Sequence, residues 1–172
     1  MPGKKNEKNQ LPHLDVKGRA RMVDITAKPP TMRMAVARGW VQMSEPTLRL
    51  IENKEIKKGD VLAVAQVAAI MAAKRTPDII PMCHPLLLAG VEMDFRLDFR
   101  QNRVEIEASA RTTGQTGVEI EALTAVAVAG LTIYDMCKSV DRGMMLGDVR
   151  LIMKSGGKSG MFIRGGEEEW HK

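Results

Sequence analysis

The segment from Gly114 to Lys138, GQTGVEIEALTAVAVAGLTIYDMCK, predicts a buried helix with charged residues at both ends. Thr116 and Glu119 have the spacing of a capping box, which indicates that the helix begins at this turn. Residues 122–134 carry no charge and are mostly small, so every side of the helix can lie against other parts of the chain. We expect this uncharged run, which Gly130 interrupts, to be too short to span a bilayer.

Two strands precede this helix, and their patterns are the clearest in the chain. Apolar and charged residues alternate over 91–100, VEMDFRLDFR, and apolar and polar residues alternate again over 103–111, RVEIEASAR. Only Gln101 and Asn102 separate the two segments. The pattern predicts an antiparallel hairpin with one face in the core and the other face in solvent.

The remaining segments complete an α+β order. We expect a strand at 31–43, a short helix at 44–53, a helix at 61–75 capped by Asp60, an irregular loop at 78–85 and a last strand at 149–153. This order is that of the ferredoxin-like split βαβ fold, an antiparallel sheet with helices on one face. We expect a single domain at 19–164, between a flexible segment at 1–18 and a loose tail at 165–172.

The composition narrows the classes of ligand. The 172 residues are 44% hydrophobic, which is enough for one core, and the net charge of +5 suits a phosphorylated ligand without establishing one. The same strand order occurs in RNA-recognition motifs. However, aromatic residues make up only 3% of the chain, and the strand RVEIEASA has none that could stack on bases. Nucleic acid is therefore disfavoured as a partner.

The cysteines and histidines do not have the spacing of metal ligands. Cys83 and His84 are adjacent, Cys137 stands alone, and His13 and His171 lie in the polar ends of the chain. Two widely separated cysteines and no signal peptide indicate a reducing, cytoplasmic setting. We therefore expect no metal site.

Several residues have both a structural and a chemical interpretation. Asp135 and Lys138, three positions apart, are either an ordinary ion pair or an acid–base pair. The capping box accounts for Glu119, whereas Glu121 is a carboxylate beside a buried run and needs a partner. The sequence GGKS at 156–159 lacks the spacing and the following helix of a P-loop, which leaves a flexible basic loop that contacts anions.

The chain contains five spaced motifs: KKGDV at 57–61, AAKRTPDIIPMCHPL at 72–86, TGVEIEALTA at 116–125, LTIYDMCK at 131–138 and KSGGKSG at 154–160. Together they resemble the MoaC family, the cyclic pyranopterin monophosphate synthases of molybdenum cofactor biosynthesis. The resemblance covers about residues 23–162, and MCHP together with YDMCK is its most specific part. Ile120, where relatives often have methionine, and the N-terminal extension are minor departures.

The resemblance implies a lyase that needs no redox cofactor. Its substrate would be the cyclised GTP derivative 3′,8-cyclo-7,8-dihydroguanosine 5′-triphosphate, which is rearranged to a pterin with a cyclic phosphate and release of diphosphate. The implied catalytic residues are Lys58, Asp135 and Lys138, with a lysine of lowered pKa and a carboxylate carrying the proton transfers. The implied substrate-binding residues are Arg33, Met82, Cys83, His84, Glu119, Ile120, Glu121 and Lys154.

The resemblance also implies a homohexamer, built as a trimer of dimers. Glu121 and Asp135 are far enough apart in the sequence that one continuous helix would separate them by about 21 Å. We expect a small site that uses both residues to be shared between two copies, with their helices antiparallel across a two-fold axis. The alternative is a non-catalytic, oligomeric ferredoxin-like module that binds a nucleotide as a regulatory signal.

Overall fold

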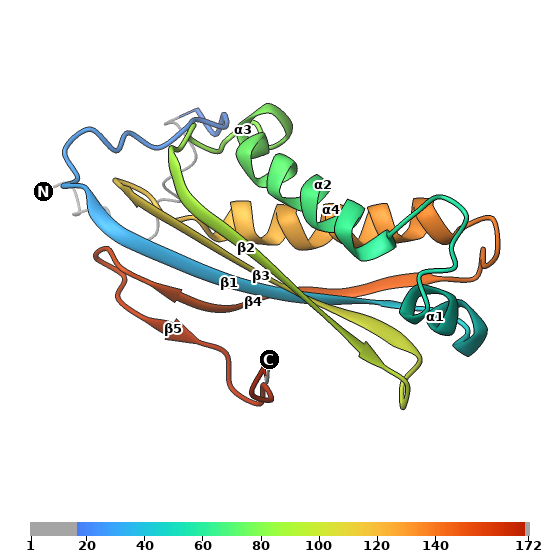
Figure 1. Cartoon of the computed structure of the whole chain (residues 1–172). Coiled ribbons are helices and arrows are strands. Elements are labelled where there is room, and N and C mark those ends of the chain that lie inside the picture. Colours follow the sequence, from blue (N-terminus) through green and yellow to red (C-terminus); the bar gives the residue numbers. More distant parts are fainter. Residues whose placement is uncertain (1–16, 171–172) are drawn as a thin grey trace, which may run out of the picture.

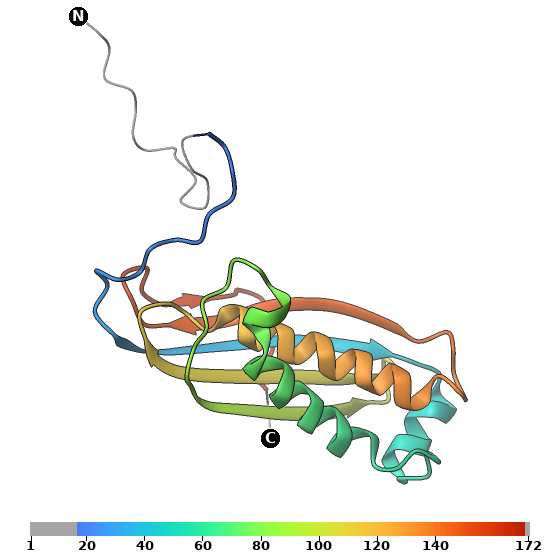
Figure 2. The same ribbon diagram turned by 90° about the horizontal axis from the view of Figure 1, so that it is seen from above.

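The computed structural model describes residues 17–170, which form a five-stranded antiparallel sheet with helices on one face (Figure 1). The strands lie in the order β2-β3-β1-β4-β5 and are β1 (Thr31–Gln42), β2 (Leu88–Asp98), β3 (Arg103–Gly114), β4 (Met145–Ser155) and β5 (Phe162–Ile163). The helices are α1 (Glu45–Glu52), α2 (Val61–Lys74), α3 (Thr76–Ile79) and α4 (Glu119–Cys137). Figure 2 shows α2 and α4 side by side over the sheet. The predicted ferredoxin-like α+β fold is confirmed, with β5 added at one edge.

The predicted hairpin forms as β2 and β3. Phe95 of β2 pairs with Ile106 of β3 in antiparallel register. Asn102 in the turn adopts a φ of 50°, a left-handed conformation that asparagine tolerates better than most residues. The alternate residues of β3 that face the helices are fully buried, and they are Val104, Ile106, Ala108 and Ala110. The period-two pattern therefore identified the core face correctly.

The predicted buried helix is α4, which packs on β1, β3 and β4 and lies beside α2. It approaches the sheet closely, because a Cβ added at Gly39 of β1 would lie only 2.8 Å from Val126 Cγ1. By length and composition alone, the 19 residues of α4 are enough to cross a membrane, whereas the expectation of too short a run concerned only the uncharged residues 122–134. The packing of α4 against the sheet and α2 accounts for the same apolar composition.

One of the three predicted side-chain caps forms, and Ser44, although it is the N-cap residue of α1, makes no capping hydrogen bond through its side chain. Asp60 caps α2, since its Oδ1 accepts a hydrogen bond from the Ala63 amide at 3.1 Å. The capping box predicted for α4 is wrong: the helix begins at Glu119, and no side chain caps it. The Glu119 carboxylate instead lies 3.8 Å from the Lys154 ammonium, a partner that is distant in the sequence.

Two segments carry more structure than predicted. The loop expected at 78–85 starts later, because α3 occupies Thr76–Ile79 and its first turn tolerates Pro77. The last predicted strand is longer than 149–153 and forms β4.

The C-terminal chain differs from the expected loose tail over residues 165–170. After β5 it turns back across the sheet face opposite the helices (Figure 1). There Glu167 forms an ion pair with Arg150 at 2.6 Å, and the Trp170 indole donates a hydrogen bond to Asp94 at 2.7 Å. These partners lie on strands that no local pattern links to the tail. The flexible segment expected at 1–18 falls outside the described residues up to residue 16.

Candidate active site

The C-terminal end of α4 carries a cluster of three charged residues. The Asp135 carboxylate lies 2.7 Å from the Lys138 ammonium and 3.2 Å from the Lys58 ammonium. Lys58 also donates a hydrogen bond to the Asp135 carbonyl oxygen at 2.6 Å. Unpaired carbonyls at a helix C-terminus attract cations, so the position favours both lysines. All three residues are exposed and can therefore be reached by a ligand.

The contacts within this cluster favour the ionised forms. The hydrogen bond from Lys138, followed by that from Lys58, holds the pKa of Asp135 below its usual value. Asp135 in turn raises the pKa of Lys138. The prediction of a catalytic lysine with a lowered pKa is therefore wrong for Lys138 in the single chain, because the neighbouring carboxylate stabilises its ammonium form. At rest Lys138 is a proton donor beside an anion.

The N-terminal end of α4 borders a cavity of about 490 Å³. Six predicted substrate-binding residues line it: Met82, Cys83 and His84 from the loop after α3, and Glu119, Ile120 and Glu121 from the first turn of α4. The cavity has the volume of a small-molecule site. His84 Nε2 lies 2.7 Å from the carbonyl oxygen of Val23, which holds the ring against the segment before β1.

Burial favours neutral groups in this cavity. Glu121 is only 3% exposed, and burial raises its pKa, with a smaller contribution from the charge of Glu119. Burial also raises the pKa of the Cys83 thiol, and the Glu121 charge adds to that effect. A protonated Glu121 would be able to donate a hydrogen bond to a ligand. From the sequence we expected this carboxylate to need a partner beside the buried run. The structure adds that the Glu121 side chain is itself buried.

A second cavity, of about 420 Å³, adjoins the first and is rich in cations. Its lining includes Lys28, Thr31, Arg33, Lys158 and Ser159, and Lys28 borders both cavities. The Arg33 guanidinium is fixed by hydrogen bonds to the carbonyl oxygens of Gly114 and Gln115, at 3.1 and 3.2 Å. Such a group of cations is suited to phosphate oxygens.

The basic loop after β4 joins these two cavities. Lys154 hydrogen-bonds Ser159 and faces Glu119, so one lysine contacts both regions. Ser159 is followed by β5 rather than by a helix, which confirms that the loop is not a P-loop. Sequence reasoning missed Lys28 as a lining residue, and it placed Lys158 only within the basic loop GGKS that was expected to contact anions. The second lysine of KSGGKSG was a signal for Lys158, whereas nothing in the local sequence pointed to Lys28.

The structure therefore gathers the predicted site residues into two groups rather than one. Met82, Cys83, His84, Arg33, Glu119, Ile120, Glu121 and Lys154 lie around the two cavities. Lys58, Asp135 and Lys138 lie at the other end of α4, about 21 Å away by the rise of the helix. Neither cavity is lined by any residue of the second group. Among residues 17–170, no three His, Cys, Asp or Glu side chains form a metal-binding group.

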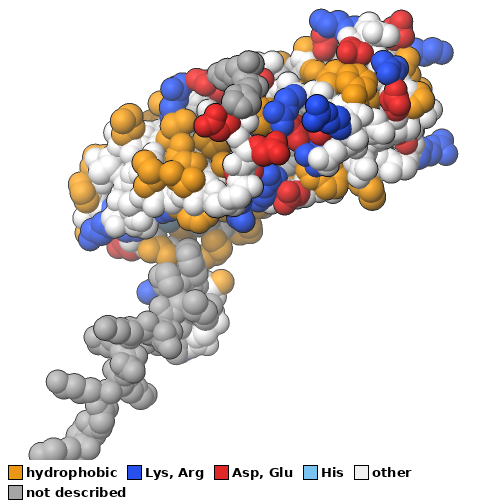
Figure 3. Space-filling view, turned by 90° about the horizontal axis from the view of Figure 1, so that it is seen from below, with side chains coloured by type: hydrophobic (Ala, Val, Ile, Leu, Met, Phe, Trp, Pro, Cys, Tyr) orange, Lys and Arg blue, Asp and Glu red, His pale blue; other side chains and the backbone are white. Residues whose placement is uncertain are grey.

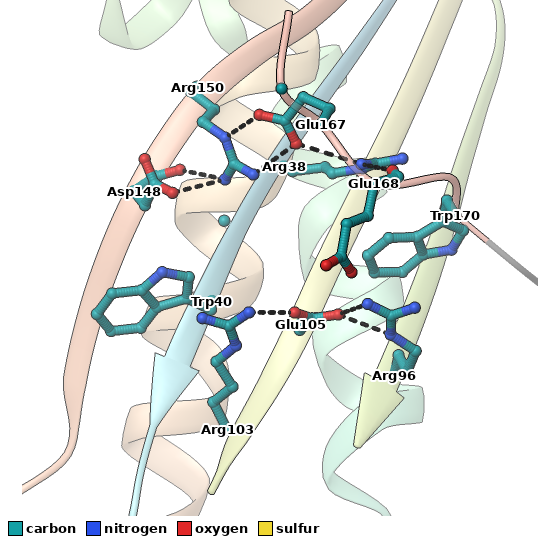
Figure 4. Close-up of a pocket in the computed structure, with 12 residues that line it drawn as sticks. Arg38, Trp40, Arg96, Arg103, Glu105, Asp148, Arg150, Glu167, Glu168 and Trp170 are labelled. Carbon is teal, nitrogen blue, oxygen red and sulfur yellow. Dashed lines mark hydrogen bonds and ion pairs between the residues drawn. The ribbon is translucent and has the colours of Figure 1, made fainter. Parts of the chain in front are cut away.

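A third cavity, of about 290 Å³, lies on the sheet face opposite the helices (Figure 4). Acidic and basic side chains are intermingled on this face (Figure 3). Arg96 and Arg103 both pair with Glu105, and Arg150 pairs with Glu167. None of the predicted site residues lines this cavity, and its charges largely compensate one another. We therefore place the active site on the helical side.

The fold and these two groups of residues define a class: an α+β protein with a cation-rich small-molecule cavity and a separate lysine–carboxylate cluster. The chain belongs to the MoaC family, whose model matches residues 22–157. It is similar to the cyclic pyranopterin monophosphate synthase of Pelotomaculum thermopropionicum, with 62% identity over 160 residues that cover 93% of this chain and 94% of the relative.

Two further relatives with the same name extend this agreement. The one from Roseiflexus sp. is 60% identical, over 90% of this chain and 98% of its own length. The one from Desulforamulus reducens is 57% identical, over 95% of this chain and 99% of its own length. The family resemblance seen in the five motifs is thus confirmed across nearly the whole chain.

Proposed function

We propose that the chain is a cyclic pyranopterin monophosphate synthase, a lyase of molybdenum cofactor biosynthesis. It converts 3′,8-cyclo-7,8-dihydroguanosine 5′-triphosphate to cyclic pyranopterin monophosphate and releases diphosphate. The observation that carries this proposal is the identity of 57–62% to relatives of that name over at least 90% of the chain. The geometry agrees with it, since a phosphorylated heterocycle needs both an enclosed cavity and a cluster of cations.

The proposed roles follow from the two environments. The cavity at the N-terminal end of α4 holds the heterocycle, with Glu121 available as a hydrogen-bond donor. Arg33 and Lys154, together with Lys28 and Lys158, bind the triphosphate. Opening and reclosing a purine requires proton transfers, which we assign to Lys58, Asp135 and Lys138 as acid–base groups. No step of this scheme requires a redox cofactor or a metal.

We further propose that the active site is shared between two copies of the chain. The cavity and the acid–base cluster lie at opposite ends of α4, so setting two α4 helices antiparallel brings one cluster beside the partner's cavity. Exposed apolar side chains on the helical layer, namely Val64, Val67, Met71 and Leu131, support association through this side. Three such dimers form the homohexamer. Both cysteines are free thiols, which supports a reducing cytoplasm as the compartment.

The test is an assay of the purified chain with the cyclised GTP derivative. The proposal predicts pterin and diphosphate in equal amounts, and a loss of both products in the Asp135→Asn variant. Binding of the derivative without turnover would contradict the proposal and favour a regulatory nucleotide-binding module. Calorimetric titration in parallel separates that outcome from a failure to bind.

A further inference from the structure

Residues 165–170 pack through specific contacts on the sheet face opposite the helices. The Trp170 ring is flanked by two guanidinium groups, with Arg38 of β1 at 5.1 Å and Arg96 of β2 at 5.0 Å from the ring centroid. Its indole N–H donates to Asp94 Oδ2 at 2.7 Å. Guanidinium groups over an aromatic face attract it electrostatically. A single tryptophan thus contacts a central strand and an edge strand, as Figure 4 shows for its two arginines.

Glu167 attaches the same segment to the other side of the sheet. Its carboxylate accepts two hydrogen bonds from Arg150 of β4, at 2.6 and 2.7 Å, and a third from Arg38 at 3.3 Å. These hydrogen bonds hold the pKa of Glu167 below its usual value. The side chain is only 14% exposed, so the pair is shielded from water better than an ordinary surface ion pair. The segment is therefore fixed at two separate points.

The strand that precedes this segment is short and is tied to β4 by its backbone pairing and by Arg164. The Arg164 amide donates to the Ile152 carbonyl oxygen at 2.8 Å, and its Nε donates to the Leu151 carbonyl oxygen at 2.7 Å. β5 consists of only Phe162 and Ile163, which pair with Lys154 and Met153 at the edge of the sheet. Both side chains are exposed, so β5 buries little apolar surface. A short hairpin arm without a buried face is marginally stable. Anchoring the chain just beyond β5 would make up for this.

The loop between β4 and β5 contributes to the phosphate-binding region. Lys158 and Ser159 lie on it, and its glycines at 156, 157 and 160 all adopt positive φ. Lys154 lies at the end of β4, just before the loop, and hydrogen-bonds Ser159. Gly157 lies directly against the Arg33 guanidinium, leaving no room for a side chain. One end of the loop is fixed by β4. The other end is fixed by the two residues of β5 and by the hydrogen bonds of Arg164 to β4.

We propose that residues 165–170 act as a strap that holds β5 on β4 and so positions the intervening loop, with its Lys158 and Ser159, for the phosphate groups of the substrate. Glu167 and Trp170 are positioning residues, since they contact neither cavity on the helical side. The family model ends at residue 157, before the strap begins. The kinetic part of this inference rests on the proposed function, whereas its structural part does not.

The test compares Glu167→Gln and Trp170→Ala with a matched control, Glu168→Gln. The control removes the same charge from the next residue, whose contact with Arg38 is made by the backbone carbonyl. Hydrogen exchange of residues 156–164 is measured in each full-length variant, followed by KM and kcat for the cyclised GTP derivative. Loss of either anchor is expected to speed exchange of this hairpin by ~5-fold and to raise KM by a similar factor, with kcat within ~2-fold of the parent. Glu168→Gln should behave as the parent.

Trp170→Phe refines the comparison, because it keeps an aromatic ring between the arginines and loses the N–H that contacts Asp94. We expect it to lie between the parent and Trp170→Ala. If exchange becomes faster only in residues 165–170, while exchange of the hairpin and the KM stay unchanged, the proposal that these residues hold β5 on β4 is wrong. Faster exchange of the hairpin with an unchanged KM would overturn the positioning role of the strap. A chain that turns over no derivative would refute the proposed function, and the exchange measurement would still decide whether the strap holds the hairpin.

Discussion

The environments at the two ends of α4 favour different charge states of their titratable groups, neutral at one end and ionised at the other. At the N-terminal end, burial raises the pKa values of Glu121 and Cys83 and so favours their neutral forms. At the C-terminal end, Asp135 and Lys138 are exposed and hold each other ionised. One apolar helix therefore separates a shielded pocket from a charged cluster. In the proposed scheme each end is incomplete by itself: one is assigned to binding and the other to proton transfer.

The largest expected effect is loss of turnover on changing the charged end. Lys58→Ala, Asp135→Asn and Lys138→Ala should each lower the rate by about 10²–10⁴, because each removes a proposed acid–base group. Since all three residues are exposed, the variants should fold normally, which thermal unfolding followed by circular dichroism checks. Near-parental activity in all three would mean that the catalytic assignment is wrong.

Substitutions that push the middle of α4 away from the sheet should destabilise the fold. Gly39→Ala places a methyl group 2.8 Å from Val126 Cγ1 in the buried core, and we expect a loss of about 1–3 kcal/mol in the free energy of unfolding. Gly130→Ala is the comparison: its tightest contact is 2.9 Å to Leu146 Cδ2, the end of an exposed side chain that can move, with Val41 Cγ2 at 3.4 Å, and alanine favours a helix. Denaturant unfolding should show the smaller change for Gly130→Ala, and equal losses would contradict the close packing described at Gly39.

The two ends should respond oppositely to pH. A carboxyl with a raised pKa keeps its proton in the folded chain after the unfolded chain has lost it, so it costs stability as pH rises above the usual glutamate range. Glu121→Gln should therefore stabilise the chain at pH 7 relative to pH 4. Asp135 has a lowered pKa and stabilises above the usual aspartate range, so Asp135→Asn should show the opposite sign. Unfolding free energies at both pH values test this, and a common sign would contradict the contrast.

The smallest effect is a difference in thiol reactivity. Cys137, near the charged end, is fully buried, and burial raises its pKa to about 11. Cys83 lies at the cavity and is partly exposed, although burial raises its pKa as well. Because the thiolate is the reactive form, iodoacetamide at neutral pH should modify Cys83 slowly and Cys137 more slowly still. Peptide mass spectrometry would reveal the reverse order if Cys137 were accessible.

The sequence predicted the parts of the fold whose signals are local. Strict alternation identified the β2–β3 hairpin, and the Asp60 cap and the uncharged run identified α2 and α4. The capping box failed because Val118, and not Thr116, is the N-cap residue of α4, so Glu119 is the first helical residue and not the third. The position of residues 165–170 on the sheet could not be predicted from the sequence, because Trp170 contacts arginines from two strands that only the fold brings together.

The candidate site was predictable in composition but not in arrangement. The motifs identified most of its residues. The direction in which the pKa of Lys138 shifts, however, depends on the contact with Asp135, which the spacing alone does not define. Lys28 belongs to none of the motifs. It lines both cavities because the segment before β1 lies beside them. Helix length, by contrast, was enough to predict that Glu121 and Asp135 lie far apart in one chain.

The central claim is that one active site takes its two halves from two copies of the chain, and subunit complementation tests it most directly. Inactive Glu121→Ala protein is mixed with inactive Asp135→Asn protein under conditions in which subunits exchange, and turnover is measured. In a mixed dimer one of the two sites regains both groups, so random mixing should restore about a quarter of the parental activity. Activity that stays at the background of either variant, with exchange confirmed by labelled subunits, would contradict a shared site.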